Sequence, residues 1–225
     1  MSKMLERLSR TFSVELSTVL VECFQRAYRA SADCYDPLIG HDEMVFGLMV
    51  HKSIKHFIVT LALEEPSIPI TIRSRAPRFL FEIEGFTVSA YRVGDSLDMD
   101  PAETFPNNRN GAGMLAMSNQ QQMSFSFMHE GAELDDDSSC SNLIIAHSGS
   151  SEEGLQRVFV GVPSKLDESH KVVAWSSTLE LWRREGGGAS MAATASGGPV
   201  SPVPVEKIAP PVLSLKDVRK PEEIK

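Results

Sequence analysis

Residues 79–93 read FLFEIEGFTVSAYRV, in which apolar residues recur at every second position on both sides of a Glu-Gly pair. A period of two is typical of a strand with one buried face, and Glu84-Gly85 suits a tight turn between two strands. We therefore predict a β-hairpin over residues 79–93. The recurring residues are Phe79, Phe81, Ile83, Phe86, Val88 and Ala90.

Further strands are expected on both sides of this hairpin. Residues 68–73 alternate in the same way, and the apolar runs NLIIAHS (142–148) and LQRVFVGV (155–162) flank the turn-like sequence GSSEEG, which predicts a second hairpin. Residues 172–182 fit either a strand or a helix. Residues 44–50, MVFGLMV, are interpreted as a short apolar strand in which Gly47 marks a bend.

Helices are expected mainly in the first third of the chain. Apolar residues recur at three- and four-residue spacings over residues 11–30 and again over 54–62, and a short helix is expected at 114–123. Helices come first and hairpins follow, without the strand–helix–strand alternation of parallel sheets. The predicted fold class is α+β: N-terminal helices packed on a mostly antiparallel sheet built from hairpins, with a disordered C-terminal tail.

The domain organisation follows from a change of composition after Glu185. We expect a single α+β domain over residues 1–185, a flexible Gly/Ala/Ser/Pro linker over 186–209 and a C-terminal tail over 210–225. The tail regains apolar residues, which makes it a candidate docking peptide that orders on binding; the alternative is a plain solvated tail. The Ala, Pro and Val bias hints at a bacterial source. The candidate partner-binding residues are Val212, Leu213, Leu215 and Val218.

Charge and cysteine content narrow the function classes. The net charge is −8: residues 1–185 carry −9 and residues 186–225 carry +1. A body this acidic repels phosphate backbones, so nucleic acid is not an expected partner. Three cysteines without a CxxC pair favour a reducing compartment. No uninterrupted apolar run reaches the roughly 18–20 residues of a membrane span, and no secretory signal is recognisable. We expect a cytoplasmic protein that does not enter the membrane.

Three histidines in residues 41–57, HDEMVFGLMVHKSIKHF, raise the question of a metal site. His51 and His56 are five residues apart, which places them ~140° apart around a helix, whereas a helical zinc motif has its histidines four apart. We predict no metal and no cofactor. His41, Asp42 and Glu43 remain open to combination with a distant ligand; the plainer interpretation is a surface loop followed by a solvated helix.

Two further candidate sites depend on side chains that the fold would have to bring together. Arg73, Arg75 and Arg78 are interpreted as an anion-binding set, or else as a solvated strand face whose arginines pair with Glu82 and Glu84.

His41, Asp42 and His147 form an alternative polar cluster. His147 with Glu152 or Glu153 is a candidate acid–base pair, against the simpler interpretation of a polar loop.

No complete catalytic constellation is recognisable, so no catalytic residue is predicted. We expect a non-catalytic protein-binding or regulatory module that acts through its acidic body and its tethered C-terminal peptide, with a protein as partner. The alternative is a small enzyme or a nucleotide- or anion-binding protein, whose site would be assembled from His, Asp and Arg residues far apart in the sequence.

Overall fold

The helices begin at polar side chains that cap them. The structure, a computed structural model, describes residues 2–74, 78–97, 115–122, 140–166 and 172–185. Ser2, Ser13 and Asp42 each accept a hydrogen bond from the backbone N–H three residues later, an N–H that the helix leaves unpaired. The helices that follow are α1 (Lys3–Thr11), α2 (Val14–Cys34), the 3-10 helix η1 (Pro37–Ile39) and α3 (Glu43–Glu64).

The helix predicted over residues 11–30 is confirmed as α2, which starts at the Ser13 cap, while Thr11 ends a separate helix, α1. One prediction about these helices needs correction. Residues 44–50, predicted as a short strand, are the first turns of α3. The cap at Asp42 starts this helix, and its buried residues recur every four positions, as one face of a helix requires. They are Phe46, Val50, Ile54 and Ile58.

Six strands form one sheet in which spatial order follows chain order. Both predicted hairpins are confirmed: β2 pairs with β3 around Glu84-Gly85, and β4 pairs with β5 around residues 151–153. Residues 172–182, left open between strand and helix, belong to a strand. The strands are β1 (Ile70–Ser74), β2 (Leu80–Ile83), β3 (Phe86–Gly94), β4 (Asn142–Ser150), β5 (Gly154–Leu166) and β6 (Val172–Arg183).

One pair of neighbouring strands is parallel. β3 and β4 run in the same direction, from Thr87 opposite Asn142 to Gly94 opposite Ser148, while the other four neighbouring pairs are antiparallel. Residues 95–141 make the connection, and a parallel pair needs a crossover of this kind. The expected mostly antiparallel sheet is therefore confirmed, and β3–β4 is the one parallel pair among its described strands.

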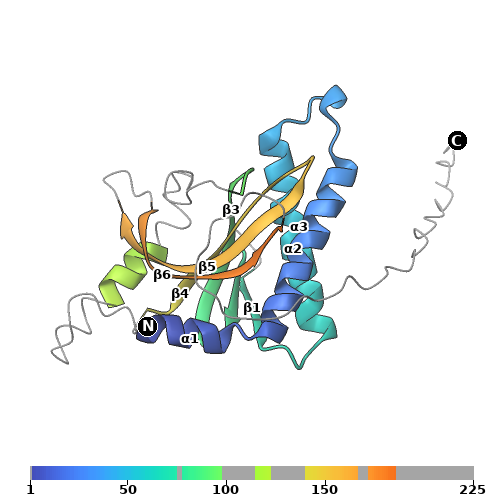
Figure 1. The fold of residues 1–225 in the computed structure, drawn as a ribbon. Helices are drawn as coiled ribbons and strands as arrows, with labels where there is room; N and C mark the ends of the chain where they lie inside the picture. The colour runs from blue at the N-terminus through green and yellow to red at the C-terminus, as the bar shows by residue number, and fades with distance from the viewer. Residues whose placement is uncertain (1, 75–77, 98–114, 123–139, 167–171, 186–225) are drawn as a thin grey trace, which may run out of the picture. The chain divides into compact units, whose positions relative to one another are not determined.

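The helices cover one face of the sheet and form the main core with it. Alternate residues of β4 separate the two faces: Leu143 and Ile145 pack among the residues of α1, α2 and α3, whereas Ile144 and Ala146 lie on the opposite face with Ala116. Figure 1 shows α2 and α3 side by side, joined at the end that carries η1. This arrangement is the predicted α+β class.

A short helix at residues 115–122 packs on the second face of the sheet. Its bounds are close to those of the helix predicted over 114–123. Asn119 is buried and its Nδ2 donates to the carbonyl oxygens of Asn142 and Pro163, at 2.9 and 3.2 Å. Its Oδ1 accepts from the backbone N–H and the side chain of Asn142, at 3.2 and 3.1 Å. The polar residues of this helix thus bind it to the ends of β4 and β5.

α3 is long and apolar enough, by length and composition alone, to cross a membrane; it is the single such helix among the described residues. One helix of this kind does not indicate a membrane-spanning protein. Here Phe46, Val50, Ile54 and Ile58 pack in the core of the domain. The predicted linker and tail, residues 186–225, lie outside the described residues.

Candidate functional site

A polar cluster lies where α2, α3, β3 and β4 meet. It consists of the side chains of Tyr28, Glu43, Arg92 and His147 and the backbone carbonyl of Gly149, and we call it the polar cluster below. His147 follows Leu143 and Ile145 in the alternation of β4, which directs its ring toward the helices. There it lies edge-on to the ring of Phe24, with ring centroids 5.1 Å apart.

Tyr28 and His147 form the closed end of the polar cluster. Tyr28 Oη and His147 Nδ1 are 2.9 Å apart and share one hydrogen bond, and each residue is only 1% exposed. Buried polar atoms are stable in a protein interior when they are paired in this way, because the bond replaces the one that water would make. The contact therefore ties the middle of α2 to β4.

Burial also fixes the protonation of this pair. Burial, then the positive charge of Arg92 and then His51 lower the pKa of His147 to about 3. Burial raises the pKa of the Tyr28 hydroxyl well above its ordinary value. Both groups are consequently neutral near pH 7.

Arg92 joins β3 to β4 and α3. Its Nε and Nη2 donate to the carbonyl oxygen of Gly149 at 3.1 and 2.8 Å, and Nη2 also lies 2.9 Å from Oε2 of Glu43. The guanidinium carbon is 5.4 Å from the centroid of the Phe46 ring. One side chain thus meets a carbonyl, a carboxylate and an aromatic face, which holds the end of β4 against α3.

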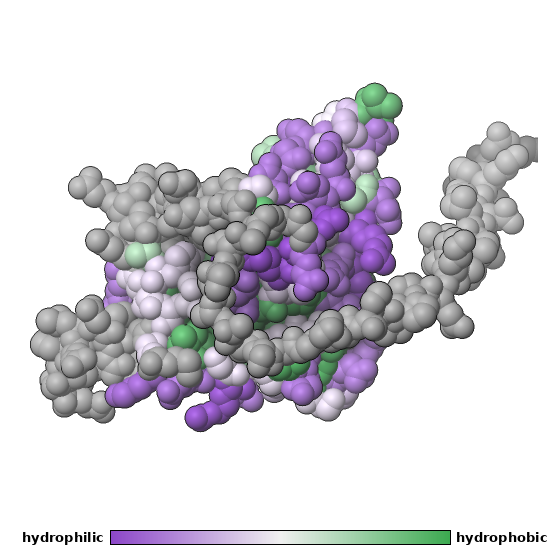
Figure 2. Space-filling model, viewed as in Figure 1, coloured by the Kyte–Doolittle hydropathy of each residue, from purple (hydrophilic) through white to green (hydrophobic). Residues whose placement is uncertain are grey.

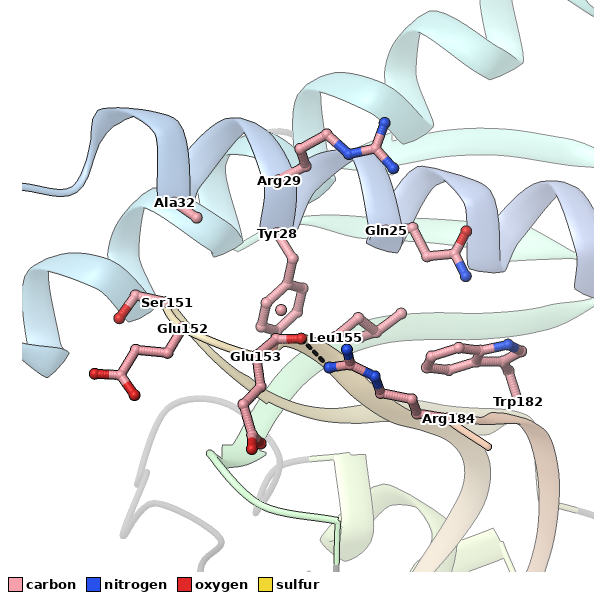
Figure 3. A pocket seen from close by; sticks show the side chains of 11 residues that line it. Gln25, Tyr28, Arg29, Ala32, Ser151, Glu152, Glu153, Leu155, Trp182 and Arg184 are labelled. Atoms are coloured by element: carbon pink, nitrogen blue, oxygen red, sulfur yellow. Dashed lines mark hydrogen bonds between the residues drawn. The ribbon is translucent and has the colours of Figure 1, made fainter. Parts of the chain in front are cut away.

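A pocket of about 430 Å³ opens beside Tyr28, between α2, the β4–β5 turn and the end of β6. Figure 3 shows the ring of Tyr28 in this pocket, with Gln25 and Trp182 at one side and Glu152 at the other. Nη1 of Arg184 donates to the backbone carbonyl of Glu153, which closes the turn against the end of β6. The charged side chains of the lining are Arg29, Glu152, Glu153 and Arg184.

The buried histidine of the polar cluster is poorly suited to acid–base catalysis. General bases work best with a pKa near the working pH, and the pKa of His147 lies near 3. His147 is also absent from the pocket lining, where Tyr28 stands in front of it. Within the described part of the chain, no three His, Cys, Asp or Glu side chains lie together in a way that would hold a metal ion.

The structure describes two of the three predicted anion-binding arginines. Arg73 on β1 forms an ion pair with Glu82 on β2, one of the pairings that the sequence suggested. Arg75 lies outside the described residues, and Arg78 comes two residues before β2. Glu84 instead accepts a hydrogen bond from Oγ1 of Thr11, at 3.1 Å.

The sequence also predicted a cluster of His41, Asp42 and His147, and each of these three residues has a partner of its own. His41 Nδ1 accepts from the backbone N–H of Asp36 at 3.0 Å, and Asp42 caps α3. His147 shares its hydrogen bond with Tyr28, and none of the hydrogen bonds among the described residues joins His147 to Glu152 or Glu153. His51 and His56 are both exposed residues of α3.

Sequence spacing does not single out Tyr28 or Arg92, because 119 residues separate Tyr28 from His147. Tyr28 falls in the apolar stripe of a predicted helix, and Arg92 is one polar residue in a predicted hairpin. A usable signal does exist in NLIIAHS: alternation places His147 on the same face as Leu143 and Ile145, and so predicts a buried histidine.

Exposed apolar side chains gather at the joined end of α2 and α3. Leu38 and Ile39 on η1 and Met44 and Leu48 on α3 are between 55% and 95% exposed. We call these four residues the hairpin end. Figure 2 shows a hydrophobic group at the tip of this part of the molecule. Contiguous exposed apolar residues on a folded domain often mark an interaction site.

Comparison of the chain with protein families, with curated proteins and with solved structures gave no match in any of the three.

Proposed function

We propose that the protein is a non-catalytic protein-binding module and that the hairpin end is its docking surface. The observation that carries the proposal is the exposure of four large apolar side chains within eleven residues of sequence, 38 to 48. Covering these side chains with a partner would remove apolar area from water, which is favourable at roughly 25 cal/mol per Å² before the costs of association.

The interior of the domain supports the non-catalytic part of the proposal. The buried histidine is neutral, hydrogen-bonded to Tyr28 and shielded by it from the pocket. Arg92 is engaged by Gly149 and Glu43, and Arg73 by Glu82. These polar groups serve one another, so they stabilise the fold and are not available to a substrate.

The tail and the location of the protein complete the proposal. The tail, residues 210–225, acts as a second contact, since a tethered contact raises avidity through its effective concentration. We place the protein in the cytoplasm, where thiols stay reduced. None of its three cysteines is disulfide-bonded, and burial raises the pKa of the Cys23 thiol to about 11, which makes that thiol unreactive.

Site-specific photo-crosslinking in native cells tests the hairpin end. A photoreactive residue at position 38 is expected to capture one dominant protein partner. For the double variant L38S/I39S the photoreactive residue is placed at position 48, and this variant is expected to lose the partner. Val14 provides the matched control, because it is apolar and 79% exposed but lies at the start of α2, away from the hairpin end. The same residue at position 14 is expected to capture no such partner.

Two results would contradict the proposal. One is the same set of captured proteins at positions 14 and 38, which would mean that capture follows exposure alone. The other is no captured protein at position 38 in cells where the full chain is present at its normal level. Truncation after Glu185 tests the tail separately: an unchanged amount of captured partner would remove the tail from the proposal.

A further inference from the structure

We infer that the solvent face of α3 binds an acidic protein segment, apolar at both ends and rich in carboxylates at its middle. This inference rests on the proposed docking function and names the chemistry of its partner. It starts from a local reversal of charge. Residues 44–63 contain no Asp or Glu but include two lysines and two histidines, in a body whose net charge is −9.

The pattern along α3 places these charges between two apolar groups. The sequence positions 44, 48, 52, 55, 59 and 63 are three or four residues apart and therefore share one face of the helix. That face is opposite the buried residues Phe46, Val50, Ile54 and Ile58. In order along the helix it carries Met44, Leu48, Lys52, Lys55, Val59 and Leu63, of which Lys55 and Val59 are half-buried and the other four are exposed.

The positive charge at the middle of this face comes from α3 itself. Lys52 and His56 are exposed, and Lys55 between them is half-buried. The cation of Arg26 on α2 lies elsewhere, because its guanidinium carbon is 4.5 Å from the ring centroid of Phe57, a residue on the core side of α3. The middle of the face is therefore basic, and its two ends are apolar.

The dimensions of the face fit an extended or helical segment of a partner. Fifteen residues separate Leu48 from Leu63, so at 1.5 Å per residue the two side chains are about 22 Å apart along the axis. A partner helix of about four turns covers this distance. Its apolar side chains would meet the two ends, and its carboxylates would meet Lys52 and His56 near the centre.

Charge and shape favour an acidic protein segment over other occupants. A second copy of this chain, placed antiparallel about a two-fold axis at the middle of the face, would put Lys52 against Lys55. An anionic membrane would be repelled at the hairpin end, where Asp36 and Asp42 flank Leu38 and Ile39 in the sequence and cap the two helices there. A nucleic acid backbone would offer nothing apolar to Leu48 and Leu63, and the whole body would repel it.

The test is to crosslink the full chain in its native cells from positions 48 and 63 and to sequence the captured peptide. Both positions are exposed and both flank the charged middle of the face, so Lys52 and Lys55 stay intact. We expect one protein segment, captured from both positions, with more carboxylates than basic residues between its two crosslinked sites. The double variant K52E/K55E is expected to lower the yield roughly tenfold, because like charges would then face each other.

Lys3→Glu is the matched control, since it makes a charge reversal at an exposed site on α1. It is expected to leave the yield unchanged. Equal unfolding curves for the three proteins would exclude misfolding as the cause of a loss. The inference is overturned by a captured segment without excess carboxylates, by capture of the chain's own peptides, by capture of nucleic acid or lipid, or by a yield that K52E/K55E leaves unchanged. It is also overturned by no capture from positions 48 and 63.

The outcomes also separate this inference from the proposed function. If L38S/I39S loses the partner but K52E/K55E keeps it, the docking function stands and the acidic segment is wrong. If position 38 captures no partner at all, the docking function itself fails.

Discussion

The polar cluster and the solvent face of α3 both carry cationic and histidine side chains, but they use them differently. In the polar cluster, His147 is bonded to Tyr28, and Arg92 reaches a carbonyl and a carboxylate, so the groups satisfy one another. On α3, Lys52 and His56 are exposed to solvent. The comparison predicts that substitutions in the first region change stability, and that substitutions in the second change binding.

Within the polar cluster, the largest expected effect is that of Gly149→Ala. A Cβ at position 149 would lie against the backbone carbonyl of Gly154 and 2.6 Å from Cε1 of Tyr28. The Cα of Leu155 is also close, at 2.9 Å. Two of the three neighbours are backbone atoms and the third belongs to a buried ring, so none can move cheaply. We expect the free energy of unfolding to fall by about 3 kcal/mol, measured by urea denaturation.

Gly47→Ala is the matched control for that substitution. Gly47 also lies near Arg92, but a Cβ there would be 3.5 Å from Nη1 of Arg92, an ordinary contact. Because Gly47 lies inside α3, alanine should raise the free energy of unfolding by about 0.5–1 kcal/mol. The two Gly→Ala substitutions are thus expected to change the free energy of unfolding in opposite directions. Equal losses of stability would contradict the packing described for Gly149.

The second expected effect is acid sensitivity caused by His147. Its pKa is about 3 in the folded protein and near 6.5 when unfolded, so between these values only the unfolded chain takes up the proton. Stability from this group is complete above pH 6.5 and is lost as the pH falls toward 3. From about pH 7 to about pH 5 the loss should be about 2 kcal/mol.

The measurement is urea denaturation at the two pH values for the natural protein and for His147→Gln. We expect the variant to lack this part of the pH dependence, whatever its absolute stability. Tyr28→Phe should keep it, because burial is the main cause of the lowered pKa. Equal pH dependence in the natural protein and His147→Gln would show that His147 is accessible to protons in the folded state.

Much of the fold, but little of the polar cluster, could be predicted from the sequence. The β2–β3 hairpin is local: Phe81 and Val88 face each other across a two-residue turn, so the alternation of nearby residues contains the information. The start of α3 was missed because β-branched residues and Gly47 resemble a strand. There the core contacts of Phe46 and Val50 override local preference.

The parallel pair and the polar cluster could not be read from spacing for a physical reason. β3 and β4 are brought together by a connection of 47 residues, 95 to 141, whose sequence shows no regular period. The cluster then takes one side chain from each of four elements. Its contacts depend on how the helices are placed on the sheet, and residue periodicity says nothing about that placement.

The smallest expected effect on stability is that of L38S/I39S, at the exposed hairpin end. Leu38 and Ile39 are mostly exposed, so their removal loses little burial. We expect the free energy of unfolding to stay within about 0.5 kcal/mol of the natural value. Phe46→Ala, one turn into α3 and fully buried, should cost about 3–5 kcal/mol in the same assay. If L38S/I39S instead lost more than about 1 kcal/mol, these side chains would be packed against the body in solution. Their exposure would then no longer support a docking surface.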